Sequence, residues 1–317
     1  MKRNILKGVK PFNTVFYKSC YNHQLLAGLS ILGVDSGAYL LNEFVRFDKD
    51  FAVKSGNYLS QNEVEKTLGY SLKRMNINLK KLIRQIDRGR PVIVGVDSYE
   101  LESRADFYHT THGGHFVLAY GYDLTADACY IVDHRYAQSF RYEEKVISLK
   151  NLLEANRAYN ANIHRAKTSA IALRKRKAGA KVDFLKLILE NKRELTENRE
   201  NVLNNFLKMK EILGAGAEQI EQRCGDMLGF VEAAKDSKQL LLATEMAGLR
   251  KEMAALLDRQ VSIYTYFKAL LHRMTFMKDY GYIESRLENV FRKIDSAMES
   301  EREFYGILLE TEVEKDV

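Results

Sequence analysis

Three residues in the first half of the chain have the types and the order of a thiol catalyst. Cys20 comes just ahead of an apolar helical stretch, His115 opens a β-branched and aromatic run, and Asp133 closes the next such run. A cysteine attacks as its thiolate, so it needs an imidazole to hold its proton, and the imidazole needs an acceptor that fixes its tautomer. This order predicts a catalytic group made of Cys20, His115 and Asp133.

The position of Cys20 distinguishes it from the other two cysteines. Ser19 precedes it and residues 24–32 follow as a helical stretch, so the thiol would feel the positive end of a helix dipole, which lowers a cysteine's pKa. A single cysteine is otherwise most often a buried, inert side chain. Cys129 lies in an apolar strand and Cys224 lies far from any motif, so we expect both to be structural.

The partners of the thiol also have alternatives. His115 could be an ordinary core histidine, and Asp133 could simply initiate a turn. If Asp133 does not reach the imidazole, His134 and Asp123 are the reserve candidates on the same pair of strands.

Three histidines are spaced by three residues, as in some metal sites: His109, His112 and His115. Three imidazoles could bind zinc. The segment crosses from a loop into a strand, however, and that spacing does not hold the rings on one face of a strand. We therefore expect no metal.

The first half of the chain is predicted to be mixed α/β. Apolar residues at three- and four-residue spacing indicate short helices, and β-branched runs bounded by polar turns indicate strands. We expect helices at residues 61–68 and 79–87, and strands at 92–96, 115–122 and 128–133, with 146–149 closing the sheet or entering the next helix.

From about Asn151 strand patterns vanish and apolar residues recur with helical period to the end. Four helices are expected at 182–213, 217–234, 239–274 and 282–309, with candidate breaks at 214–216, 236–237 and 281. The fold class is therefore α+β, with a catalytic domain at 1–150 and an all-helical domain at 151–317. Aromatic residues of the helical half would form core or wall off a site: Tyr264, Tyr266, Phe267, Phe276, Tyr280 and Tyr282.

The charge balance narrows the choice of partners. Lys and Arg number 49 against 42 Asp and Glu, giving a net charge of +7 with both signs well mixed. This excludes a polycationic nucleic-acid binder and suits an acidic protein partner or an anionic substrate. The basic run 174–177 is predicted to be a solvated helix face or linker, with an acidic docking surface as the alternative.

No targeting or membrane segment is recognisable in the sequence. The basic start of the chain is not followed by an apolar h-region, and no run of 18 apolar residues occurs. Three widely spaced cysteines fit a reducing compartment. We therefore expect a cytoplasmic protein without a membrane partner.

Three segments together resemble a known family. They are Ser19-Cys20 leading into a helix, residues 114–123 (Gly-His-Phe-Val-Leu-Ala-Tyr-Gly-Tyr-Asp), and Ile131-Val132-Asp133. They are similar to the papain-like domain of the butirosin acyltransferase family, over roughly residues 10 to 150. Leader peptidases attached to bacteriocin exporters carry a similar pair of His and Asp strands.

The resemblance implies a papain-like cysteine protease fold followed by a large helical C-terminal region. In the butirosin group the domain takes an acyl chain from a carrier-protein thioester and gives it to an amine. Related papain-fold proteins form amide bonds in nonribosomal peptide pathways such as that of closthioamide. The implied partners are an acyl or peptidyl carrier protein, whose phosphopantetheine carries the substrate, and a small amine acceptor. No cofactor of the enzyme's own is implied.

The sequence departs from the peptidase pattern upstream of the cysteine. Papain-type peptidases carry a glutamine about six residues before the cysteine, which donates to the oxyanion, whereas this chain has Asn13-Thr14-Val15 there. Asn13 or Thr14 could substitute, alongside the Cys20 backbone amide. Amides are poor electrophiles that need a strong oxyanion hole, whereas a thioester is already activated. The departure therefore favours thioester chemistry.

The favoured function is an ATP-independent acyltransferase that forms an amide in secondary-metabolite biosynthesis. The chain has no phosphate-binding loop of the Gly-x-x-x-x-Gly-Lys type, which argues against ATP-driven ligation. A cysteine peptidase or amidase using the same three residues is the alternative. A non-catalytic helical interaction protein with a degenerate papain domain is a third.

Overall fold

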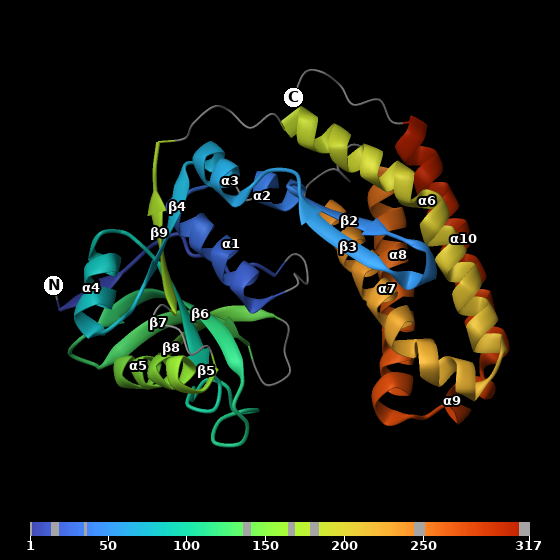
Figure 1. Cartoon of the computed structure of the whole chain (residues 1–317). Helices are drawn as coiled ribbons and strands as arrows, with labels where there is room; N and C mark the ends of the chain where they lie inside the picture. Colours follow the sequence, from blue (N-terminus) through green and yellow to red (C-terminus); the bar gives the residue numbers. More distant parts are fainter. Residues whose placement is uncertain are drawn as a thin grey trace. The chain divides into compact units, whose positions relative to one another are not determined.

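The computed structural model describes residues 2–13, 19–34, 37–135, 141–163, 169–177, 184–243 and 251–310. The chain forms two compact units, residues 1–36 with 60–182, and residues 37–59 with 183–317. The first unit is mixed α+β with an antiparallel sheet, and the second is mainly helical (Figure 1). The boundary predicted after residue 150 lies inside the first unit, because a helix and a strand that follow it still pack into the sheet.

The first unit is built on an antiparallel sheet. Within the described residues it has seven strands in the order β4-β9-β5-β6-β7-β8, with β1 pairing with β6 beyond the end of β5. The long strand β6 is central, because β7 pairs along one of its edges while β5 and then β1 share the other. The strands are β1 (Arg3–Ile5), β4 (Tyr70–Met75), β5 (Val92–Asp97), β6 (Gly114–Asp123), β7 (Ala128–His134), β8 (Tyr142–Ser148) and β9 (Ala170–Lys175).

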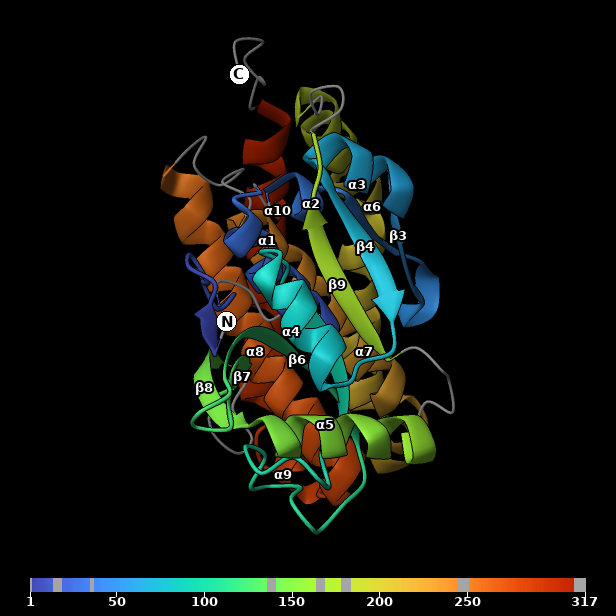
Figure 2. The same ribbon diagram turned by 90° about the vertical axis from the view of Figure 1, so that its left-hand side faces the viewer.

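Helices cover both faces of this sheet. On one face, α4 (Leu79–Asp87) and α5 (Leu149–Ala158) join the alternate residues of β5 and β6 in one buried core, which includes Val94 and Val117. On the other face lies α1 (Cys20–Leu32) (Figures 1 and 2). There Gly28 lies against Leu118 and Leu173. The α3 helix (Gln61–Leu68) comes directly before β4 in the chain and ends at Gly69, which adopts the left-handed conformation.

Strand β9 corrects the prediction that strands end near residue 151. It inserts between β4 and β5, where Ala170 and Ala172 are buried. Alanine is a strong helix former and a weak strand former, so the pairing with two neighbouring strands decided this segment. Arg174 and Lys175 of the basic run therefore end a strand, paired with Ser71 and Tyr70, and do not lie on a helix.

The second unit contains the long helices. They are α6 (Phe184–Gly214), α7 (Ala217–Ala243), α8 (Lys251–Met277) and α10 (Leu287–Glu310), with the short α2 (Gly37–Leu41) and α9 (Gly281–Glu284). The predicted break at 214–216 is confirmed. The one at 236–237 is wrong: α7 continues, and the Ser237 hydroxyl donates to the Ala234 carbonyl (2.8 Å) inside the helix.

Aromatic residues of α8 belong to the core of the second unit. Tyr264 and Phe267 are buried there, and Tyr266, Tyr280 and Tyr282 pack against the same core. The side chain of Phe276 lies outside the described residues. Among the described helices, none is both long and apolar enough to cross a membrane.

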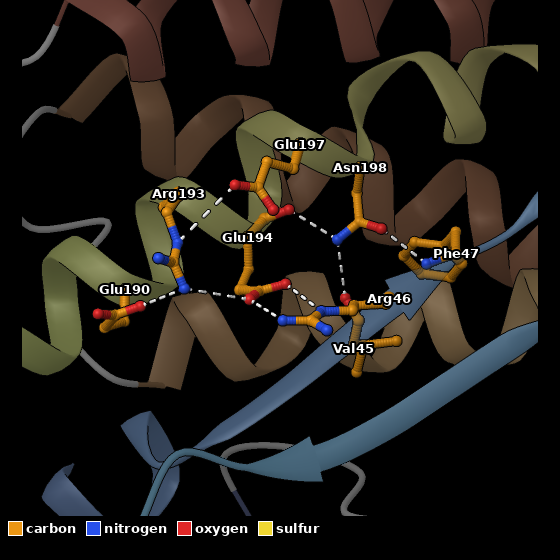
Figure 3. Close-up of polar contacts among 8 residues, drawn as sticks. All are labelled: Val45, Arg46, Phe47, Glu190, Arg193, Glu194, Glu197 and Asn198. Atoms are coloured by element: carbon orange, nitrogen blue, oxygen red, sulfur yellow. Dashed lines mark hydrogen bonds and ion pairs between the residues drawn. The ribbon is translucent and has the colours of Figure 1, made fainter.

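The second unit also contains a hairpin that the sequence did not predict, β2 (Glu43–Phe47) and β3 (Val53–Asn57). Along one edge of β2, backbone N–H and C=O groups bind side chains of a helix instead of another strand. Asn191, Asn198 and Asn205 of α6 are spaced by seven residues, about two helical turns. Asn198 accepts from the Phe47 N–H (2.7 Å) and donates to the Val45 carbonyl (3.1 Å) (Figure 3). Asn191 and Asn205 bind backbone atoms before and after this strand.

An ion pair lies beside this asparagine ladder. The Arg46 guanidinium binds the almost fully buried Glu194 carboxylate, while Arg193 reaches Glu190 at 2.6 Å (Figure 3). The hydrogen bond and the charge of Arg46 outweigh burial and lower the pKa of Glu194. The hairpin is therefore fixed to α6 by backbone and side-chain contacts together.

Candidate active site

Cys20 is the first residue of α1, as the sequence predicted. Ser19 caps the helix with its hydroxyl accepting from the Asn22 N–H (3.4 Å). The helix can approach the sheet closely because Gly28 has no side chain: a Cβ there would lie 2.6 Å from Leu173 Cδ2. This approach brings the start of α1, and with it the Cys20 thiol, to the first residues of β6.

Several groups stabilise the thiolate form of Cys20. Burial raises its pKa, but the hydrogen bond and charge of His115 and the backbone N–H groups of Phe116 and Tyr21 outweigh burial, so the pKa is lowered. The N–H of Phe116 is in place because the ladder between β6 and β7 runs from Leu118 to Asp123 and does not include the first residues of β6.

His115 lies between Cys20 and Asp133. Its Nε2 bonds with Asp133 Oδ1 at 2.7 Å, which leaves Nδ1 for the thiol. Burial lowers the pKa of His115, but the charge and hydrogen bond of Asp133, together with Cys20, raise it to about 9. A lowered thiol pKa beside a raised imidazole pKa describes a thiolate–imidazolium pair.

Asp133 is fully buried and has three partners. Besides His115, the Ser103 hydroxyl donates to its Oδ2 (2.7 Å) and the His134 backbone N–H donates to its Oδ1 (2.7 Å). Burial raises the pKa of this carboxyl, but the charge and hydrogen bond of His115 and the two further donors outweigh it and lower the pKa. An ionised carboxylate at this position holds the imidazole in one orientation.

A second layer of aromatic and imidazole rings surrounds the pair. The His134 ring packs edge-on against His115 (5.0 Å between centroids), and its Nε2 bonds with the Tyr142 hydroxyl at 2.9 Å. Tyr142 also stacks on His23 of α1 (4.5 Å). Burial and the charge of His115 lower the pKa of His134 to about 4, so this ring is neutral at neutral pH.

Three other aromatic rings lie on the Phe116 side of the thiol. Tyr21 packs edge-on against Phe116 (5.6 Å), which in turn contacts Tyr159 (5.9 Å). Tyr159 can lie there because Gly95 has no side chain: a Cβ on Gly95 would lie 2.8 Å from its ring. Burial is the main cause that raises the pKa of Tyr159, and the charge of Cys20 is the second. This effect of the thiolate means that the phenol lies near the sulfur.

Of the two predicted oxyanion donors, only Asn13 lies within the described residues. Thr14 lies outside the described residues. Asn13 binds the backbone of Tyr142 twice, donating to its carbonyl (2.8 Å) and accepting from its N–H (2.7 Å). Its side chain thus joins the segment before α1 to the start of β8. The donors already directed at the sulfur are the N–H groups of Tyr21 and Phe116.

The structure separates the other candidates from the thiol. Asp123 accepts from the N–H groups of Thr125 (2.9 Å) and Ala126 (3.2 Å) in the β6–β7 turn. Cys129 is buried in the sheet core, and burial raises its pKa to about 12. Cys224 is buried in the second unit.

The three histidines of the zinc hypothesis also diverge. His115 binds Asp133, His112 binds Asp97 through Nδ1 (2.7 Å), and His109 packs against tyrosine rings. Among the described residues, no group of three or more His, Cys, Asp or Glu could hold a metal ion.

Sequence reasoning missed three residues of the site: Ser103, Tyr142 and Tyr159. Ser103 lies in an irregular loop and Tyr159 follows α5, which covers one face of the sheet, so no local periodicity marks either. Tyr142 is the first residue of β8 and pairs there with His134 of β7. A correct pairing of the predicted strands would have placed it beside the reserve candidate His134.

Comparison with known proteins gives one family match. Residues 52–134 match the family model described as butirosin biosynthesis protein H, N-terminal. This confirms the resemblance noted in the sequence, over a stretch that includes His115 and Asp133 but begins after Cys20. No curated protein matches the chain.

Proposed function

We propose that this protein is a cysteine-dependent acyltransferase with a papain-like first unit, which forms amide bonds from carrier-bound thioesters in a biosynthetic pathway. The observation that carries the proposal is the Cys20–His115–Asp133 arrangement, in which a lowered thiol pKa, a raised imidazole pKa and a buried carboxylate occur together. The family match supports a biosynthetic role of the acyltransferase type.

The first half-reaction is a thioester exchange. The Cys20 thiolate attacks the acyl carbon, a bond forms between Sγ and that carbon, and the bond to the pantetheine sulfur breaks. His115, as imidazolium, gives its proton to the departing pantetheine thiolate. One thioester replaces another, so the step needs no nucleotide.

The second half-reaction transfers the acyl group to a neutral amine. The amine nitrogen bonds to the acyl carbon, its proton passes to His115, and Cys20 leaves as a thiolate. This restores the thiolate–imidazolium pair. Asp133 keeps Nε2 of His115 occupied throughout, so Nδ1 always faces the reacting atoms.

The N–H groups of Tyr21 and Phe116 are the donors best placed to stabilise a tetrahedral intermediate at Cys20. Backbone donors suit a thioester, which is more electrophilic than an amide. Asn13, whose amide already binds the Tyr142 carbonyl, would contribute by holding β8 against the start of α1. We keep Thr14 as a further candidate donor.

The proposed partners are an acyl or peptidyl carrier protein and a small amine. The mild basic excess of the chain suits an acidic carrier. The acyl group would arrive on the carrier's phosphopantetheine, with no cofactor resident in the enzyme, and the reaction would take place in the cytoplasm.

The test is to incubate the full-length protein with an acyl-pantetheine thioester and a panel of amines. Mass spectrometry should find the acyl mass on Cys20, and amide should exceed free acid at millimolar amine. An adduct that persists in Cys20→Ala, or maps to Cys129 or Cys224, would overturn the assignment. Free acid alone would point to a thioesterase or peptidase, and cleavage of plain peptides at comparable rates would establish the cysteine peptidase or amidase alternative.

A further inference from the structure

A second histidine–carboxylate pair lies just before β6. Asp97, at the end of β5, is fully buried and accepts from the N–H groups of Tyr99 (3.1 Å) and Gly113 (3.2 Å). Its Oδ2 faces Nδ1 of His112 (2.7 Å) and the Asn162 amide (3.3 Å). Burial raises the pKa of Asp97, but these four donors, His112 first among them, outweigh it and lower the pKa.

This carboxylate fixes the protonation pattern of His112. A buried, ionised Asp97 accepts a proton from Nδ1, so the neutral ring carries its lone pair on Nε2. The ring also stacks on Tyr99 (4.3 Å between centroids, 20° between planes), and half of the side chain is exposed. Among the described residues no hydrogen-bond partner is recorded for Nε2. His112 therefore offers an oriented proton acceptor to solvent.

A short helical segment connects this pair with the thiol site. Residues 159–163 follow α5, and Asn162 binds Asp97 while Tyr159 packs against Phe116 and lies near Cys20. His112 and His115 are three residues apart along the chain, so their Cα atoms can be at most about 10 Å apart. Both imidazoles therefore lie at the same end of the sheet.

An alkylammonium acceptor must lose one more proton than the triad takes. An alkyl amine with a lysine-like pKa near 10.4 is a cation at neutral pH, and on the order of one molecule in a thousand is uncharged. The cation must lose one proton before it can attack and a second during attack. His115 takes the second; the first can go to solvent, or to a base held beside the acyl-enzyme. Water, which competes for the acyl-enzyme, is already neutral and has no such requirement.

We infer that His112, oriented by Asp97 and Tyr99 at the same end of the sheet as the thiol site, is the base that receives the first proton of the acceptor ammonium group. The lone pair of Nε2 bonds to that proton, the N–H bond of the ammonium breaks, and the neutral amine moves on to the acyl carbon. The imidazolium of His112 then releases the proton to solvent. This role rests on the acyltransferase function proposed above.

The test compares two amines in the full-length protein and in His112→Asn, which keeps a hydrogen-bond donor for Asp97 and removes the proton acceptor. The probes are propylamine, charged at neutral pH, and hydroxylamine, mostly neutral there. The donor is an acyl-pantetheine thioester. We expect amide formation with propylamine to slow about 100-fold in His112→Asn. Acylation of Cys20, hydrolysis of the acyl-enzyme and transfer to hydroxylamine should each stay within about twofold.

His109→Asn is the matched control. His109 contacts the same Tyr99 ring and has no carboxylate partner among the contacts that the structure records for it. This variant should behave like the unaltered protein with both amines.

The outcomes separate this inference from the function it rests on. Equal slowing with both amines would show that His112 only supports the fold, and an unchanged propylamine rate would show that it is not the base; either overturns the inference and leaves the acyltransferase function standing. Absence of any acyl-Cys20 in the unaltered protein would overturn both.

Discussion

Both units of this protein bury charged groups, but they use them differently. In the first unit, the buried His115 and Asp133 meet a sulfur that is only partly covered. In the second, Lys238 and Glu301 pair at 3.0 Å with both side chains almost completely buried. The Tyr264 hydroxyl donates to the same carboxylate at 2.7 Å.

The difference lies in what remains available to a substrate. Both charges of the Lys238–Glu301 pair bind groups inside the second unit. The ammonium also lies 3.8 Å from the centre of the Phe304 ring. Burial outweighs the charge of Glu301 and lowers the pKa of Lys238. In the first unit the Asp133 carboxylate and Nε2 of His115 bind each other, which leaves the Cys20 sulfur as the reactive atom. A buried ion pair becomes a candidate catalyst where it ends on an accessible nucleophile.

The largest expected effect comes from breaking the sealed pair. Lys238→Met should lower the free energy of unfolding by about 3–5 kcal/mol, because it leaves the Glu301 charge buried without its cation. Denaturant unfolding followed by circular dichroism measures this loss. The rate of Cys20 alkylation under native conditions should not change.

A double variant serves as the control for this prediction. Lys238→Met combined with Glu301→Leu removes both charges and should recover most of the lost stability. A single variant as stable as the unaltered protein would mean that the buried pair contributes nothing to the second unit.

In the first unit, neutralising the buried carboxylate should lower activity. Asp133→Asn should slow acyl transfer about 100-fold, because the imidazole loses the charge that orients it and supports its protonated form. Steady-state rates with a thioester donor test this. Asp123→Asn, at the β6–β7 turn, is the matched control and should keep full activity; the reverse result would exchange the roles of the two residues.

Polar contacts without charge should contribute less than the buried pair. Asn198→Ala should lower the free energy of unfolding by about 2 kcal/mol, because it leaves the Phe47 N–H and the Val45 carbonyl without their partner. Asn204, exposed on the same helix, provides the comparison. Because alanine is the better helix former, Asn204→Ala should cost nothing in thermal or denaturant unfolding; a loss as large as that of Asn198→Ala would show that the ladder is not its cause.

The smallest expected effect concerns the thiolate itself. His115→Ala removes the strongest contribution that lowers the pKa of Cys20 and leaves burial, which raises it, so the pKa should rise. Alkylation by iodoacetamide at pH 7 should slow about tenfold, and its pH profile should move to higher pH. Cys129, with its pKa raised to about 12, should not react in either protein.

The unaltered enzyme should show the complementary pH limit. Its rate of Cys20 acylation should fall as pH rises through about 9, because His115 then loses the proton that the leaving thiol requires. On the acid side, activity should be lost as the Cys20 thiolate is protonated, below the ordinary thiol range. A thiol profile unaffected by His115→Ala would show that the two groups are not coupled.

Local sequence determined much of the first unit. The helices predicted at residues 61–68 and 79–87 have the observed bounds of α3 and α4. Both carry polar caps, Ser60 and Asn78, and an apolar stripe, which are signals contained within about ten residues. The strands predicted at 115–122 and 128–133 correspond to β6 and β7, which pair directly and carry His115 and Asp133.

Tertiary structure alone decided which partners these elements have. The alanine-containing segment 170–175 became a strand because β4 and β5 offered two open edges, and β2 was completed by asparagines about 150 residues away in the chain. Periodicity reports which face of an element is buried, but a backbone edge or a buried carboxylate can be satisfied by any donor that the fold brings near. For the same reason the sequence determined the types and order of Cys20, His115 and Asp133, whereas Ser103, and the pairing of His112 with Asp97, were decided only by the folded chain.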